Sequence, residues 1–461
     1  MVEKTLYVEI MRALAIPAKH STSTSAYRRR TGSMRFSHVP GVGIAGASTA
    51  AATGRGGPAP TLDFFLDRLV APVILRADKA KLHCMTALTR RTFLGAAPLT
   101  LAGCAARRAA LPPASPAARL PQVFVSPGRV IRTTVGLRPF RPGGFVVRAQ
   151  KLDSKTVIHN YGHGGAGITL SWGTAQLAAD EARAAGLKTS GPGECAVIGC
   201  GVIGLATARL LQERGYSPTI YAREMPPNTT SNLAGGLWEP VSLFDEPRVT
   251  PEFRRQFSEA ARIAFRRYQS FAGEPYGVRW LPLYSLNREH AYAAPSPERP
   301  DSDIESLYPE ARPLSPTENP FDVPYAYRRQ TMLIEPAIYL SALIRDFHSA
   351  GGKIVIRDFP STSALMELRE PLLFNCTGLG ARALFGDEDL IPIRGQLVVL
   401  LPQPELNYCT IGPSGVYMFP RHDGVLLGGS FERGVWNTDP DPTVTERILR
   451  DNSLLFGAMR R

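Results

Sequence analysis

Two glycine-rich motifs lie close together in this chain, and they constrain its fold more than any other feature. The first, His159–Gly167, holds three glycines near its end. The second, Gly199–Gly204, has the sequence Gly-Cys-Gly-Val-Ile-Gly and starts 35 positions after Gly164. A predicted helix follows each motif, the first over Leu170–Ala185. We therefore expect both turns to belong to one α/β fold.

The second motif has the flanking elements of a dinucleotide-binding turn. A short apolar strand, Ala196–Ile198, precedes it, and a strand at Ser217–Ala222 completes a βαβ unit. Gly199 permits the tight turn, Gly201 lets the backbone approach a pyrophosphate, and Gly204 permits close packing of the helix. The helix N-terminus then faces the anion. The pattern alone does not separate FAD from NAD, and a glycine turn that binds nothing is the alternative.

Together, the two motifs resemble those of the D-amino-acid oxidase family of flavoproteins. In that family a fingerprint like Gly199–Gly204 opens the chain and a stretch like His159–Gly167 closes it. The resemblance covers about residues 131–456 and implies a Rossmann-type FAD-binding domain with a second, mainly antiparallel substrate-binding domain. The reversed order implies a circular permutation. A flexible linker over Leu187–Glu194 reaches roughly 14–17 Å, enough to join the usual ends.

The resemblance implies FAD contacts on several segments. Thr229–Pro240 matches the family's second flavin loop, where hydroxyls hold phosphate oxygens, although a Ser/Thr-rich loop before a Gly-rich turn is the alternative. Glu224, with Arg223 beside it, ends the second strand, where the adenosine ribose binds. His163 is expected to be structural. The predicted cofactor-binding residues are Gly164, Gly165, Ala166, Gly167, Ile168, Thr169, Gly199, Gly201, Val202, Ile203, Gly204, Arg223, Glu224, Thr229, Thr230, Ser231, Ala234, Gly235, Gly236 and Leu237.

Three residues carry the implied catalytic roles. The family's carboxylate-binding arginine falls on Arg138, its second carboxylate-binding tyrosine falls on Tyr417, and the carbonyl of Gly165 receives the substrate amine. Two prolines fix Gly136–Pro142, which we predict to be a loop; a rigid surface turn with solvated arginines is the alternative. A tyrosine packed in the core is the alternative for Tyr417. The segment Asn407–Gly415 is short and lacks the lid tyrosine of animal members. No second cationic group stands out for an acidic side chain.

The basic charge of the chain lies outside the motif-bearing part. The formal net charge is +13, but residues 1–134 carry 19 Lys+Arg against 5 Asp+Glu, and the remaining residues carry 34 against 35. The basic part has no interleaved aromatic residues, so we do not expect nucleic-acid binding. None of the six cysteines has zinc-site spacing, and we expect no metal. No stretch of 18 apolar residues predicts a membrane span.

The N-terminal part predicts a targeting segment. Residues 1–84 are predicted to be a low-complexity extension, which is non-native if the protein starts at Met85, with one short helix expected near 62–75. After Met85, Arg90-Arg91 and the box Leu101–Cys104 resemble a twin-arginine signal of a lipoprotein, with Cys104 as the lipid acceptor. We favour Met85 as the start. The expected location is the periplasmic side of the cell envelope, and the alternative is the cytoplasm.

The predicted organisation has three parts. Residues 1–84 form an extension, residues 85–130 form the signal and linker, and residues 131–461 form the catalytic module. Within the module, the FAD-binding parts are 155–250 and 335–392. The substrate-binding parts are 131–154, 251–334 and 393–440.

The family resemblance implies FAD-dependent oxidative deamination of D-amino acids. The products are 2-oxo acids, ammonia and hydrogen peroxide, and the partners are a D-amino acid and molecular oxygen. One alternative is a related flavin amine oxidase for D-aspartate, glycine or sarcosine. Another is a flavin-binding dehydrogenase or redox protein that does not use oxygen. The sequence does not define the oligomeric state.

Overall fold

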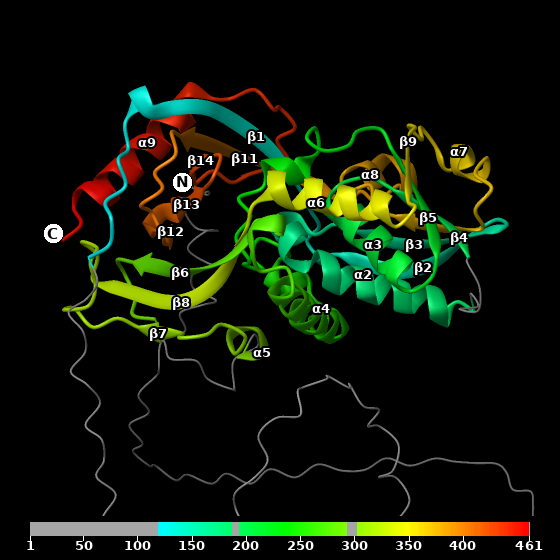
Figure 1. Ribbon diagram of the computed structural model, residues 1–461, viewed down its shortest axis with the longest axis horizontal. Helices are drawn as coiled ribbons and strands as arrows, with labels where there is room; N and C mark the ends of the chain where they lie inside the picture. The colour runs from blue at the N-terminus through cyan, green and yellow to red at the C-terminus, as the bar shows by residue number, and fades with distance from the viewer. Residues whose placement is uncertain (1–118, 187–192, 293–301, 461) are drawn as a thin grey trace, which may run out of the picture. The chain divides into compact units, whose positions relative to one another are not determined.

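The computed structural model describes residues 119–186, 193–292 and 302–460. Within these ranges the chain forms a six-stranded sheet and a nine-stranded sheet. Figure 1 shows the larger sheet on the left and the smaller sheet, flanked by helices, on the right. This arrangement confirms the predicted α/β class with a second, mainly antiparallel part. The expected helix near 62–75, the twin-arginine pattern and Cys104 lie outside the described residues.

The small sheet is mostly parallel and has the apolar strands of a sheet that is covered on both faces. Its strand order is β2-β3-β10-β4-β5-β9, and every neighbouring pair is parallel except the edge pair β2–β3. Parallel strands covered on both faces have continuous apolar runs, as in Ala196–Ile198. The parallel strands share one carboxyl edge, where the glycine turn after β4 lies. The strands are β2 (Val146–Leu152), β3 (Lys155–Tyr161), β4 (Glu194–Ile198), β5 (Ser217–Ala222), β9 (Lys353–Ile356) and β10 (Leu372–Asn375).

Helices cover the small sheet and pack closely on one another. Helix α2 packs against α3 and α4, and α3 also packs against α6. The α2–α4 crossing depends on Gly173, because a Cβ atom there would lie 1.9 Å from the carbonyl oxygen of Ala260. Helix α4 begins with Pro251, and the Thr250 side chain accepts the Phe253 amide at 3.1 Å. These helices are α2 (Gly167–Ala184), α3 (Val202–Glu213), α4 (Pro251–Gln269) and α6 (Pro336–Ser349); shorter ones are α5 (Ser302–Glu305), α7 (Thr362–Met366) and α8 (Gly380–Phe385).

The large sheet has the order β1-β11-β14-β13-β12-β6-β8-β7, with β15 also paired to β11. All pairs are antiparallel except β12–β6. A tight turn at His422-Asp423 joins β13 and β14. Helix α9 (Pro442–Gly457) packs on β11 and β14. The strands are β1 (Val130–Phe140), β6 (Val278–Asn287), β7 (Arg312–Pro313), β8 (Tyr325–Ile334), β11 (Ile391–Leu400), β12 (Cys409–Ile411), β13 (Tyr417–Arg421), β14 (Gly424–Gly428) and β15 (Glu432–Arg433).

Residues 136–140 are the end of strand β1, so the loop predicted over Gly136–Pro142 is wrong for most of its length. Strand β1 pairs with β11 through Phe140 and lies at the edge of the large sheet. An edge strand tolerates a proline because one side of its backbone makes no ladder hydrogen bonds. Strand β2 also differs from expectation: it lies inside the 131–154 segment predicted for substrate binding, yet it pairs in the small sheet.

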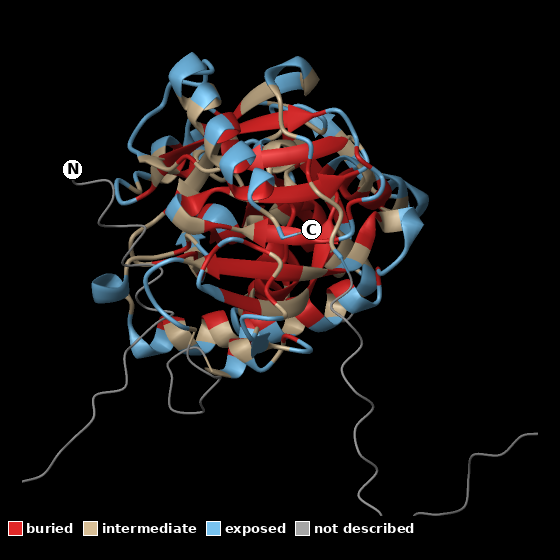
Figure 2. Ribbon diagram, turned by 90° about the vertical axis from the view of Figure 1, so that its left-hand side faces the viewer, coloured by how far each residue is buried: buried red, intermediate tan, exposed pale blue. Residues whose placement is uncertain are grey.

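The first described residues pack against the last helix. The side-chain amide of Gln122 donates to the carbonyl oxygen of Phe456 at 2.9 Å, and Val123 is buried in the same apolar cluster as Phe456. The globular part therefore begins earlier than the predicted Ile131. Figure 2 shows the buried residues gathered in the strands and exposed residues on the outer helices and loops. No helix in the described ranges is long and apolar enough to cross a membrane.

Candidate active site

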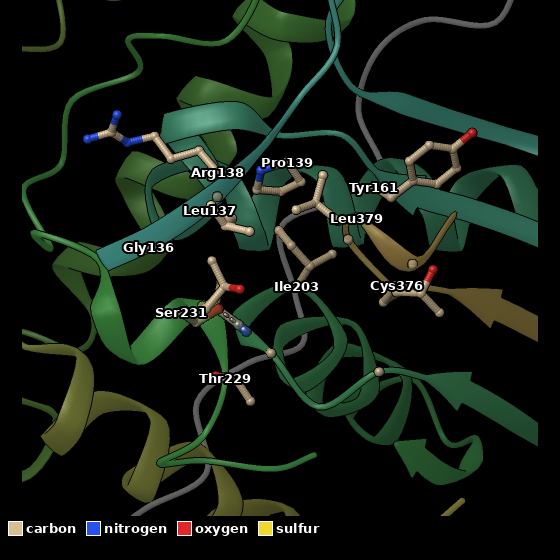
Figure 3. A pocket seen from close by; sticks show the side chains of 18 of the residues that line it. Gly136, Leu137, Arg138, Pro139, Tyr161, Ile203, Thr229, Ser231, Cys376 and Leu379 are labelled. Carbon is tan, nitrogen blue, oxygen red and sulfur yellow. Dashed lines mark hydrogen bonds between the residues drawn. The ribbon is translucent and has the colours of Figure 1, made fainter. Parts of the chain in front are cut away.

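A cavity of about 840 Å³ lies along the carboxyl edge of the small sheet (Figure 3). Its wall is formed by the turns after β4, β5 and β10, by residues 227–235, by the start of α2 and by β1. These segments are far apart in the sequence. Their meeting at one edge follows from the parallel strand order.

The turn between β4 and α3 leaves no room for side chains. Gly199 has φ +115°, and a Cβ atom there would lie 2.4 Å from the Cys376 carbonyl oxygen. A Cβ atom on Gly204 would lie 2.0 Å from the carbonyl oxygen of Gly199. The fingerprint glycines are therefore required sterically, as the motif predicts. The turn aims the N-terminus of α3 into the cavity.

Ser231 lies at this helix N-terminus. Its hydroxyl oxygen accepts the Val202 amide at 3.0 Å, the bond drawn in Figure 3. A Cβ atom on Gly201 would lie 3.2 Å from the same hydroxyl oxygen. Ser231 thus marks the place where helix amides are available to an anion.

The far end of the cavity is formed by the residues that follow β5 and β9. Arg223 and Glu224 line it, and their charged groups lie 3.5 Å apart in an exposed position. Residues 357–359 also line it, and the Arg357 amide donates to the Ala222 carbonyl oxygen at 2.9 Å. This segment was not predicted to line the site because its sequence carries no recognisable motif. Only the parallel pairing of β9 with β5 brings it to this edge.

The histidine-glycine stretch forms a short 3-10 turn, Gly164–Ala166, before α2. The Gly165 amide donates to the Ser242 carbonyl oxygen at 2.9 Å, and a Cβ atom on Gly164 would lie 2.2 Å from that oxygen. Nε2 of His163 lies 3.0 Å from Oγ1 of Thr174, and burial lowers the pKa of His163 to about 3. His163 is therefore neutral and structural, which agrees with the role expected for it.

Arg138 and Tyr417 come together above two glycines of the large sheet. A Cβ atom on Gly395 would lie 2.7 Å from Nη2 of Arg138, and one on Gly428 would lie 2.0 Å from Cζ of Tyr417. Burial raises the pKa of the Tyr417 hydroxyl, while the Arg138 charge and a hydrogen bond from it act in the opposite direction. No carboxylate of the described residues forms an ion pair with Arg138. In Figure 3, Arg138 and Cys376 lie on opposite sides of the cavity.

A second cavity, of about 930 Å³, adjoins the first. Four residues line both: Arg138, Gly165, Gly235 and Tyr417. Leu237, Phe419 and Phe431 add apolar surface to the second cavity. The predicted catalytic residues therefore stand where the two cavities meet.

Glu239 lies in the wall of the second cavity and was not predicted from the sequence. Its carboxylate is 2.7 Å from Nη2 of Arg329 and accepts the Tyr308 hydroxyl at 3.1 Å. Its backbone amide donates to Oγ1 of Thr169 at 3.2 Å, which ties this wall to the start of α2. Burial raises the pKa of Tyr308 well above its usual value, so this hydroxyl stays a donor.

Most of the predicted cofactor-binding residues reach a cavity. Gly204, Ala166 and Thr169 line neither one: Gly204 packs on its own turn, and the other two are buried. Gly236 and Leu237 line the second cavity. The predicted residues that line the first are Gly164, Gly165, Gly167, Ile168, Gly199, Gly201, Val202, Ile203, Arg223, Glu224, Thr229, Thr230, Ser231, Ala234 and Gly235.

The first cavity fits a dinucleotide. A helix N-terminus opens onto its wall beside the hydroxyls of residues 229–231, and an acidic residue follows β5. The side-chain oxygen of Asn160, which also lines the cavity, is buried without a hydrogen-bond partner in the described residues. The glycine turns at Gly165 and Gly235 line both cavities, and they leave room for a flat ring against their backbone at the junction.

Comparison with known proteins decides the family. The model of the family "DAO: FAD dependent oxidoreductase" matches residues 67–181 and 194–460. The chain belongs to this family. FAD is its cofactor, and the chain is an FAD-dependent oxidoreductase. The match confirms the resemblance predicted from the two glycine motifs.

Curated relatives agree with the assignment to the FAD-dependent oxidoreductases. The chain is 34% identical to a D-amino-acid oxidase of Rubrobacter xylanophilus over 269 residues, covering 57% of this chain and 77% of that protein. It is 34% identical to a D-amino-acid oxidase of Streptomyces coelicolor over 264 residues, 56% of this chain and 76% of that protein. A D-aspartate oxidase of Homo sapiens is 29% identical over 263 residues, 55% of this chain and 73% of that protein.

Proposed function

We propose that this protein catalyses the FAD-dependent oxidative deamination of D-amino acids to 2-oxo acids, ammonia and hydrogen peroxide. The observation that carries the proposal is the pairing of Arg138 with Tyr417 at the junction of the two cavities. The identity to two D-amino-acid oxidases supports the same substrate class.

Arg138 and Tyr417 hold the substrate carboxylate. The guanidinium group is a planar fork that matches a carboxylate, and it has no ion pair with the described residues to compete for it. The raised pKa of Tyr417 keeps its hydroxyl protonated, so it donates to the same carboxylate. The Arg138 guanidinium group packs on Gly395 and the Tyr417 ring packs on Gly428. Because glycine has no side chain, both groups lie close to the sheet.

Gly165 positions the other end of the substrate. Its amide is committed to the Ser242 carbonyl oxygen, which fixes the orientation of the turn that lines both cavities. The carbonyl of Gly165 then receives the substrate amine. With carboxylate and amine both held, the Cα hydrogen of one enantiomer faces the first cavity.

The protein supplies orientation rather than a strong base. His163 is neutral and bonded to Thr174, and the Glu239 carboxylate is paired with Arg329. FAD held by the glycine turns at Gly165, Gly201 and Gly235 would supply the acceptor for the hydride of the substrate Cα and the route of the electrons to oxygen. The imine product hydrolyses to the 2-oxo acid and ammonia.

The absorbance of the purified protein under nitrogen tests this function. A yellow protein whose 450 nm band bleaches with D-alanine but not with L-alanine, and recovers in air with release of peroxide, would support it. Retention of the band with every D-amino acid would overturn it. Bleaching without peroxide release in air would favour the dehydrogenase alternative.

We also propose that the catalytic module is circularly permuted. Residues 130–184 supply β1 to the large sheet, β2 and β3 to the small sheet, and α2 to the helix layer. The family model matches the chain as two separate segments. The contact of Gln122 with Phe456 brings the start and end of the module together, as a permuted chain requires.

Export is a further part of the proposal. Arg90-Arg91 and Leu101–Cys104 support a lipoprotein start at Met85, with Cys104 acylated. A Cys104→Ala change should abolish labelling by a radioactive fatty acid and release the enzyme from the membrane fraction. Unchanged fractionation would point to the cytoplasm instead.

A further inference from the structure

Some of the charged residues that line the second cavity have an ion-pair partner and others do not. Each of its four carboxylates has a basic neighbour: Glu239 pairs with Arg329, Glu432 with Arg394, Asp451 with Arg450, and Glu289 lies 3.7 Å from His290. Three arginines in the same wall, Arg138, Arg288 and Arg447, have no ion pair with the described residues. The lining itself holds four arginines and four carboxylates, but Arg329 and Arg394, which lie behind it, pair with two of these carboxylates and leave three arginines of the wall without an ion pair in the described part of the chain. Arg138 accounts for one substrate carboxylate and leaves the others without a counter-ion.

Arg447 is the better placed of the two remaining arginines. It is half-buried, whereas Arg288 is exposed. It lies on the face of α9 that lines the cavity, together with Val444 and Asp451, at helical spacing. Its Nη2 atom donates to the carbonyl oxygen of Gly429 at 2.8 Å, which fixes the guanidinium group. An arginine has five N–H donors, so others are left for a ligand.

The Gly429 contact places Arg447 near the carboxylate-binding pair. Gly429 follows Gly428, on which the Tyr417 ring lies, and a Cβ atom on Gly429 would lie 3.1 Å from Cα of Val416. The backbone that supports Tyr417 therefore also holds Arg447. Phe419 and Phe431 line the same cavity and offer apolar surface to methylene groups.

We infer that Arg447 binds the side-chain carboxylate of the substrate, and that the preferred substrates are acidic D-amino acids, D-glutamate or D-aspartate. The inference rests on the proposed function, because Arg138 and Tyr417 must hold the α-carboxylate. An acidic side chain neutralises the unpaired charge in the wall, while a neutral one leaves a partly buried cation without a partner. Arg447 is the second cationic group that the sequence did not reveal.

The test compares two substrates that differ in charge but hardly in shape. The kcat/KM of the holoenzyme is measured with D-glutamate and D-glutamine in the parent, Arg447→Met and Arg447→Lys. We expect the parent to prefer D-glutamate, and Arg447→Met to lower kcat/KM for D-glutamate about 10- to 100-fold, the effect of losing a charged hydrogen bond. The D-glutamine value should stay within about threefold of the parent. Arg447→Lys should restore part of the loss because it keeps the charge.

An arginine outside both cavities provides the control. Arg266 on α4 is exposed and lines neither cavity. Arg266→Met removes the same type of charge but should leave the ratio of the kcat/KM values for D-glutamate and D-glutamine unchanged. If Arg266→Met lowers this ratio as much as Arg447→Met does, the role of Arg447 is overturned, since the effect is then a general one of charge.

Binding of unreactive acids gives a second readout. Glutarate and butyrate are titrated against the holoenzyme, and the shift of the flavin spectrum gives the Kd of each. Glutarate should bind more tightly than butyrate to the parent, and Arg447→Met and Arg447→Gln should both weaken glutarate without weakening butyrate. Equal affinity for glutarate in parent and Arg447→Gln overturns the inference, even if Arg447→Met fails to fold.

Failure of this inference is distinct from failure of the proposed function. If the parent oxidises D-glutamine or D-alanine at least as well as D-glutamate, the acidic preference is wrong and D-amino-acid oxidation stands. If the parent oxidises none of the three, the proposed function falls and the inference falls with it.

Discussion

The cofactor cavity and the substrate cavity are built by different means. In the first, the important contacts come from the backbone: helix α3 presents its amides, and Gly199 and Gly204 are forced by carbonyl oxygens 2.4 and 2.0 Å from their Cβ positions. In the second, the important groups are side chains on strands and helices, such as Arg138, Tyr417 and Arg447. A backbone site depends on which residues can adopt the turn. A side-chain site depends on which side chains of the strands and helices point into the cavity.

The largest effect is expected where the backbone has no room. In Gly204→Val, the new side chain would meet the Gly199 carbonyl oxygen, so α3 cannot approach the turn. We expect FAD to be lost and the protein to unfold more easily. Flavin absorbance and thermal unfolding measure this. Gly128→Ala is the control, because nothing lies within 4 Å of its Cβ position. Normal flavin content in Gly204→Val would contradict the backbone account.

A large effect on catalysis, without loss of FAD, is expected at Arg138. Arg138→Ala leaves the substrate carboxylate in the cavity without its cation, which costs about 3–5 kcal/mol. This corresponds to roughly two to four decades in kcat/KM. The assay uses a D-amino acid, with flavin content measured alongside. Near-parental kcat/KM would remove the main support for an amino-acid substrate.

A smaller loss is expected at Tyr417. Tyr417→Phe removes one hydrogen bond from a carboxylate that keeps its arginine, and should lower kcat/KM by about one decade. The raised pKa of the hydroxyl means that it remains a donor up to strongly alkaline pH in the parent. We therefore expect the pH profile of Tyr417→Phe to lack any alkaline limb due to this group. A loss as large as that of Arg138→Ala would show that the two residues act as one unit.

The smallest effect is expected from changing the chain order. A reordered chain would start at Glu194, run to Arg461 and continue from Leu120 to Ala185. The join is short because Gln122 already contacts Phe456. Flavin content and kcat/KM should match the parent within about threefold, since every strand keeps its neighbours. Two fragments that fold without a shared flavin would contradict the single module.

The sequence predicted the backbone site better than the side-chain site. The fingerprint could be recognised because each glycine has a local steric reason, and the structure places Gly199–Ile203 and residues 229–231 and 233–235 around one cavity. Residues 357–359 were missed because only the pairing of β9 with β5 brings them there. Glu239 and Arg447 were missed because no local pattern shows which way a charged side chain on a loop or a helix points.

The strand order β2-β3-β10 also affects how the chain is made. Asn375 of β10 pairs with His159 of β3, although it is synthesised 216 residues later. At about 5–20 residues per second, β3 leaves the ribosome roughly 10–40 s before its central partner exists. Every residue of β3 is buried in the finished sheet. The nascent chain must therefore keep a strand that is destined for burial out of aggregates during that interval, and translation speed becomes a determinant of the yield of active enzyme.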